Sequence, residues 1–78
     1  MANFMEKRKI KKEIKVCLQT INEIERRRSR SQAALVQAIL LHQVPDNDDV
    51  EWFNKYTGEI AACRNRLDEL QRDLDSLK

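Results

Sequence analysis

The residues best equipped for chemistry are the arginines in the run Arg26-Arg27-Arg28-Ser29-Arg30. Guanidinium groups bind phosphates, and together with the lysine-rich start of the chain they would form a basic stripe for nucleic acid. On a helix, however, these side chains point in several directions, and no aromatic residue is interleaved for base stacking. The formal net charge is only +2. Arg26, Arg27 and Arg30 are therefore candidate phosphate contacts, but the sequence favours a partner other than nucleic acid.

Catalytic and metal-binding patterns are missing from the sequence. His42 is the only histidine, and no further ligands are spaced to complete a metal site around it. Cys17 and Cys63 fall on apolar-periodic positions, so we expect free buried thiols and no disulfide. No catalytic triad or glycine-rich phosphate loop can be assembled, and two helices enclose no pocket. We expect a protein that is not an enzyme and holds no cofactor or metal.

The elements that position these side chains are helices, and the strongest helical pattern covers residues 53–77. All eight a and d positions of its heptad repeat are apolar or aromatic, namely Phe53, Tyr56, Ile60, Cys63, Leu67, Leu70, Leu74 and Leu77. With 41% apolar residues in the chain, eight such matches arise by chance roughly once in a thousand registers. The pattern predicts a helix that buries one stripe against another helix.

A first helix is expected over residues 4–43. Asn3 and Glu6 form a plausible N-terminal capping pair. Its stripe, with the same 4-3 spacing, consists of Ile10, Ile14, Cys17, Ile21, Ile24, Arg28, Ser31, Leu35, Ala38 and His42. Arg28 and Ser31 interrupt this stripe. They form a polar layer that fixes the register, in which Arg28 meets an acidic group on a partner, or the stem of Arg28 packs in the stripe while its guanidinium reaches solvent.

The turn is expected at residues 44–48, because Pro45 pushes Val44 out of the helical conformation. The second helix then covers about residues 49–77, with Asp48 and Glu51 as its capping pair. Gly58 lies at an outer position of this helix, where it costs about 1 kcal/mol relative to alanine.

These elements predict an all-α fold: one domain, residues 1–78, built as a long antiparallel helical hairpin. Matching the two stripes from the turn outwards places Leu35 opposite Tyr56 and Ser31 opposite Ile60. The same register places Glu25 beside Arg64. Charge agrees with the hairpin, since residues 1–30 hold ten Lys/Arg and four Asp/Glu, net +6, whereas residues 31–78 hold five and nine, net −4.

Apolar residues near the turn extend beyond the two stripes and predict an interface. The candidate partner-binding residues are Val36, Ile39, Leu40, Leu41, Val50, Trp52 and Phe53. Two helices alone bury little surface, so we expect a four-helix bundle, completed by a second copy or by a partner protein. The main functional hypothesis is a protein-interaction module that works as a homodimer or a heterocomplex.

Two other functions stay open. In size and shape the expected hairpin is similar to the helical-hairpin co-chaperones of type III secretion needle subunits, with the aromatic Trp52 just past the turn. This likeness of architecture implies a chaperone for a helical client. The second alternative is a nucleic-acid accessory protein that uses the Lys/Arg-rich first helix. No apolar run approaches the ~20 residues of a membrane span, and no apolar segment follows the basic start, so we expect a cytoplasmic protein.

Overall fold

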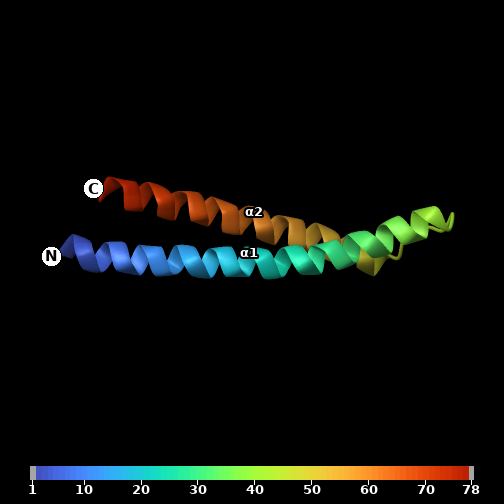
Figure 1. Cartoon of the computed structure of the whole chain (residues 1–78). Coiled ribbons are helices and arrows are strands. Elements are labelled where there is room, and N and C mark those ends of the chain that lie inside the picture. Colours follow the sequence, from blue (N-terminus) through green and yellow to red (C-terminus); the bar gives the residue numbers. More distant parts are fainter. Residues whose placement is uncertain (1, 78) are drawn as a thin grey trace.

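Two helices pack side by side as an antiparallel hairpin in the computed structural model, which describes residues 2–77 (Figure 1). Helix α1 spans Ala2–Leu40 and helix α2 spans Asn47–Ser76. The hairpin measures 61 × 16 × 14 Å, with both chain ends at the end opposite the turn. The predicted all-α hairpin is therefore confirmed. Met1 and Lys78, the ends of the predicted domain, lie outside the described residues.

The heptad stripes form the contact between the helices. All eight predicted positions from Phe53 to Leu77 are buried or half-buried, and so are the predicted positions of α1 from Ile10 to Ala38. The most protected side chains are Leu70 and Ile60, which are 2% and 4% exposed, with Ile21 and Ile24 close behind. The helices form because these apolar positions repeat with the helical period, and burying them stabilises the pair.

The turn differs from the prediction at the end of α1. This helix ends at Leu40, and His42 adopts a left-handed conformation with φ 57°. The N–H of His42 donates to the carbonyl of Ile39 at 3.0 Å, and the N–H of Gln43 donates to that of Ala38 at 2.8 Å. These two bonds define a Schellman motif, which terminates the helix. His42 is consequently exposed and does not continue the buried stripe, contrary to the prediction.

Both predicted N-terminal caps are wrong. Asn3 lies inside α1, which already begins at Ala2. At α2 the capping residue is Asp46 and not Asp48: its side chain accepts a hydrogen bond from the N–H of Asp48 at 3.1 Å. Asp46 has the extended backbone that a capping residue needs, with φ −63° and ψ 136°. The helix therefore starts at Asn47, two residues before the expected position.

The register of the two helices also differs from the prediction. Ile60 packs with Ile21 and Ile24, and Tyr56 contacts the same cluster. The predicted register had placed Ile60 opposite Ser31 and Tyr56 opposite Leu35. The helices are thus displaced by one heptad, about 10 Å along the axis. As a result, the last turns of α1 extend past the beginning of α2 (Figure 1).

Two ion pairs connect the flanks of the helices. Arg64 lies 3.0 Å from Glu25, as predicted, and Arg66 lies 3.3 Å from Glu13. Both pairs are more than 40% exposed on each side chain, so each contributes at most about 1 kcal/mol. The pair forms despite the displaced register because the side chains of Glu25 and Arg64 are long enough to reach each other. The predicted contact is therefore observed although the predicted register is wrong.

Candidate protein interface

Large apolar side chains remain exposed around the turn. This turn surface consists of Val36, Ile39, Leu40, Leu41, Val44, Val50 and Trp52. Leu40 is 73% exposed and Trp52 is 47% exposed. The overhang of α1 explains part of this exposure, because its final turn has no part of α2 beside it (Figure 1). Six of the seven predicted partner-binding residues are exposed here.

The turn surface wraps around the end of the hairpin instead of forming a flat patch. Counted from the buried heptad positions, Ile39 and Val50 lie on one flank of the contact between the helices. Leu41 and Trp52 lie on the other flank, and Leu40 faces away from α2. Partner helices can therefore approach this end from more than one side. In a four-helix bundle, a helix from the partner would pack along one flank and contact both α1 and α2.

Phe53 differs from the other predicted partner-binding residues because it is half-buried within the hairpin itself. The central guanidinium carbon of Arg28 lies over its ring, 4.8 Å from the ring centroid. Next to it, Trp52 stacks on Tyr56 with 5.6 Å between the ring centroids, and the ammonium of Lys55 lies 4.9 Å from the centroid of Trp52. These contacts hold Trp52 in place while leaving about half of it available to a partner.

A shallow groove runs along the outer face of α1. Its lining follows helical spacing from the small side chains Ser29 and Ala33 to the larger Val36 and Leu40, with Gln32 and Gln37 at its edges. Residues three and four apart share one face of a helix, so this is a second stripe on the side away from α2. Another helix could insert its side chains between these ridges.

Arg28 and Ser31 occupy half-buried positions in the contact between the helices. The Nε atom of Arg28 is buried and has no hydrogen-bond partner, and among residues 2–77 no carboxylate oxygen lies within 4.0 Å of its guanidinium. Its stem packs in the stripe and its charged end rests on Phe53. An unpaired buried N–H at this position lowers the stability of the hairpin. It also leaves the guanidinium of Arg28 able to donate a hydrogen bond to an anionic group.

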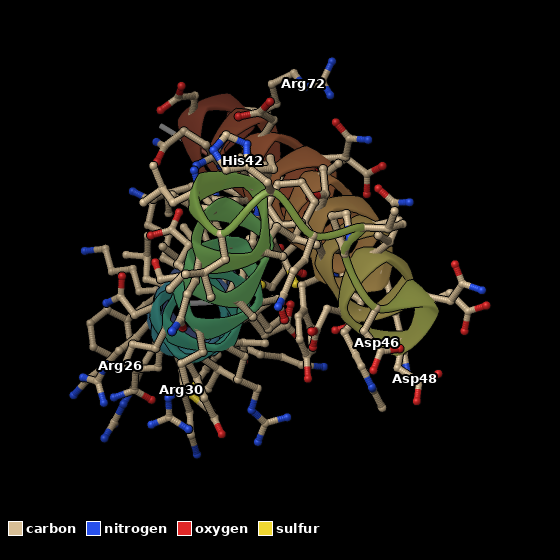
Figure 2. All side chains as sticks on the ribbon, turned by 90° about the vertical axis from the view of Figure 1, so that its right-hand side faces the viewer. Arg26, Arg30, His42, Asp46, Asp48 and Arg72 are labelled. Atoms are coloured by element: carbon tan, nitrogen blue, oxygen red, sulfur yellow. The ribbon has the colours of Figure 1, made fainter. Side chains whose placement is uncertain are left out.

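The remaining arginines of the run are exposed. Arg27 pairs with Glu23 on its own helix at 2.9 Å. Arg26 and Arg30 project away from α2 into solvent (Figure 2). Of the candidate phosphate contacts, Arg27 is therefore neutralised by Glu23. Arg26 and Arg30 have no carboxylate oxygen within 4.0 Å in the described part of the chain.

Cys17 and Cys63 are free, half-buried thiols. Within residues 2–77, no three His, Cys, Asp or Glu side chains converge as metal ligands would. Neither described helix is long and apolar enough to cross a membrane.

Several exposed apolar residues were missed by the sequence reasoning. Val44, just before Pro45, is 92% exposed and extends the turn surface. Phe4, Met5, Val16 and Leu18 are exposed on the half of α1 away from the turn. An apolar residue inside a polar turn is a signal that could have identified Val44, because turns normally carry polar side chains.

Comparisons with other proteins give no further guide to this surface. No protein-family model matches the chain, and neither the curated proteins nor the solved structures contain a significant match. The part of the chain that the structure describes is a helical hairpin with exposed apolar residues at one end and arginines in the middle of α1.

Proposed function

We propose that this chain is a non-enzymatic protein-interaction module. In this proposal the hairpin packs its turn surface against another helix, which a second copy or a different protein supplies. The observation that carries the proposal is a contrast among the described residues: four apolar residues are buried, whereas seven large apolar residues are exposed around one end. Contiguous apolar surface of this kind is typical of protein interfaces.

The total surface area supports an assembly. The chain exposes 6369 Å², whereas a compact monomer of 9.2 kDa exposes about 4,900 Å². Two copies that reached the compact value would each bury roughly 1,400 Å², which lies in the range of obligate homodimers. A lone hairpin of this length therefore lacks the burial that stabilises most domains of its size.

The test replaces exposed apolar residues that make little contact within the hairpin. Ile39→Glu/Leu40→Glu places two charges on the turn surface, where both native side chains are more than 60% exposed. We expect the wild-type protein to show concentration-dependent sedimentation and this variant to sediment as a monomer with an unchanged helical circular dichroism spectrum. The charges would have to be buried without partners in any interface at this end.

A matched control uses the other half of α1. Val16→Glu/Leu18→Glu changes two exposed apolar residues in the same way, 53% and 47% exposed, and should leave the assembly intact. A wild-type protein that stays monomeric at high micromolar concentration, and that binds no helical peptide or protein through Ile39 and Leu40, would contradict the proposal.

The co-chaperone hypothesis is a special case in which the covering helix belongs to a client. It predicts that the client keeps the hairpin from self-associating and that the Ile39→Glu/Leu40→Glu variant fails to bind it. Nucleic-acid binding instead predicts salt-dependent retention that Arg26→Ala/Arg30→Ala reduces and that the turn variant leaves unchanged.

A further inference from the structure

The half of α1 away from the turn carries a concentrated positive charge on its solvent side. Residues 4–19 contain six Lys/Arg and two Glu, net +4. We define a basic face by the side chains at the outer heptad positions and on one flank, namely Phe4, Met5, Arg8, Lys9, Lys11, Lys12, Lys15, Val16 and Leu18. All nine side chains are exposed. The basic face therefore mixes five cations with four large apolar residues and contains no acid.

The cations of the basic face are unpaired within the described part of the chain. Among residues 2–77, none of these five side chains has a carboxylate oxygen within 4.0 Å. The two acids of this segment lie on the other flank of α1: Glu13 pairs there with Arg66 of α2 at 3.3 Å, and Glu6 is one heptad before Glu13. The first turn of α1 contains no acid, so the positive end of the helix dipole adds to the charge of the face.

The basic face lies on the side of α1 away from α2. Arg8 precedes Arg26 by 18 residues, about five helical turns, so both lie on the same side of the helix. Seen along the hairpin from the turn, Arg26 projects from α1 on the side away from α2, and Arg72 projects from α2 on the opposite side (Figure 2). Residues 66–76 of α2 hold four Asp/Glu and two Arg, net −2. This half of the hairpin is thus positive along α1 and negative along α2.

A partner that covers the basic face must offer negative charge and an apolar environment together. Phe4 and Met5 are each 68% exposed, and Val16 and Leu18 are exposed on the same side. A nucleic-acid backbone would pair with the cations but leave these apolar side chains in water. Phe4 is also the only aromatic residue before Trp52, so there is no row of rings for base stacking. The interface of a bilayer with anionic lipids offers charged headgroups beside acyl chains, which suits both kinds of side chain.

We propose that the basic face binds the surface of a membrane that contains anionic phospholipids. In this arrangement α1 lies along the surface, with its ammonium and guanidinium groups at the headgroups and Phe4 and Met5 inserted between them. The net negative charge of α2 turns this helix toward the water, because an anionic surface repels it. The basic face does not include the turn surface, so this inference does not rest on the proposed function.

Cosedimentation with vesicles tests the proposal. The wild-type protein should bind phosphatidylcholine vesicles that contain about one third phosphatidylserine, and it should not bind phosphatidylcholine alone. Binding should weaken as the salt concentration rises. Lys11→Gln/Lys15→Gln should weaken binding about 25-fold, since each cation near an anionic surface contributes a factor of about five. Circular dichroism of the variant checks that its helices are intact.

Two further variants separate the basic face from net charge. Lys55→Gln/Arg72→Gln removes two exposed cations from α2 and should bind within about two-fold of the wild type, because α2 faces away from the membrane. Phe4→Ser/Met5→Ser keeps every charge and should weaken binding about ten-fold or more, because it removes apolar side chains that insert between the headgroups.

Three outcomes would overturn the proposal. The first is no binding to phosphatidylserine vesicles at low salt. The second is an equal loss of binding in the α1 and α2 cation variants, or no loss in Phe4→Ser/Met5→Ser, since either result would mean that net charge alone attracts the protein. The third is salt-dependent retention on nucleic acid, reduced in Lys11→Gln/Lys15→Gln, without binding to vesicles, which would assign the face to a phosphate backbone. Weakened vesicle binding in both basic-face variants, with an unaffected α2 variant, supports the membrane surface.

Discussion

The guanidinium of Arg28 on α1 lies over the ring of Phe53 on α2, with 4.8 Å between its central carbon and the ring centroid. This contact occupies a heptad position where an apolar residue would normally pack. Its cation–π attraction offsets part of the cost of the buried, unpaired Nε atom. The hairpin therefore holds a charged residue at a half-buried position in the contact between its helices.

Replacing Arg28 with leucine should stabilise the isolated hairpin by about 1 kcal/mol. The substitution removes an unsatisfied polar atom and adds apolar contact with Phe53, at the loss of one cation–π contact. Urea unfolding followed by circular dichroism measures the change. Arg28→Lys, which keeps the charge but not the planar stacking, is the control and should be destabilising. A less stable leucine variant would show that Arg28 makes a favourable contact.

Gly58→Ala should raise the free energy of unfolding by about 1 kcal/mol. Gly58 lies inside α2, and a Cβ built on it meets no atom within 4 Å, so alanine gains helix propensity without a clash. The reverse change at a nearby exposed site, Ala62→Gly, should lower stability by a similar amount. Thermal unfolding of both variants measures the effect. Loss of stability in Gly58→Ala would mean that a partner approaches this backbone closely in the assembled protein.

His42→Gly should stabilise the hairpin by about 0.5–1 kcal/mol. His42 has a φ of 57°, a conformation that glycine adopts without the steric cost that a side chain adds. His42→Ala removes the imidazole but keeps the Cβ, so it should be neutral or mildly destabilising. Chemical unfolding of the pair separates the backbone effect from any effect of the ring. Equal stability of the two variants would contradict the Schellman termination of α1.

Asp46→Ala should destabilise the protein by about 1 kcal/mol, because it removes the side chain that caps α2. Asp48→Ala should cost less, since its carboxylate only interacts with the positive end of the helix. Urea unfolding of the two variants measures the difference, and the variant with the lower midpoint identifies the residue that caps α2. A larger effect at Asp48 would place the start of α2 two residues later than in this structure.

Cysteine cross-linking should distinguish the observed register from the one expected from the sequence. In a Cys17→Ala/Cys63→Ala background, Ile24→Cys/Ile60→Cys should form an intramolecular disulfide under mild oxidation, because these side chains pack together. Ser31→Cys/Ile60→Cys should not, since one heptad, about 10 Å, separates the two positions along the axis. Faster cross-linking of Ser31→Cys/Ile60→Cys would contradict the observed register and support the one expected from the sequence.

The sequence was sufficient to predict the two helices, their antiparallel arrangement and the residues between them. The eight heptad residues from Phe53 to Leu77 are all buried or half-buried. An apolar stripe with the helical period is removed from water when the helix packs against another helix. Most of the turn surface could also be predicted, since its apolar residues lie outside that stripe. The exposed flank pair Glu25–Arg64 was also predicted, although from a register that is displaced by one heptad from the observed one.

Only the tertiary structure decided the register and therefore which side chains meet. A heptad pattern looks the same after a shift of seven residues, so Ile60 matches Ser31 or Ile24 equally well by pattern alone. The choice depends on how the chain reverses: α1 stops at Leu40 through the left-handed His42, and Asp46 starts α2 early. Backbone geometry of the turn, which apolar periodicity does not encode, thus sets the overhang of α1 and the exposed apolar end of the hairpin.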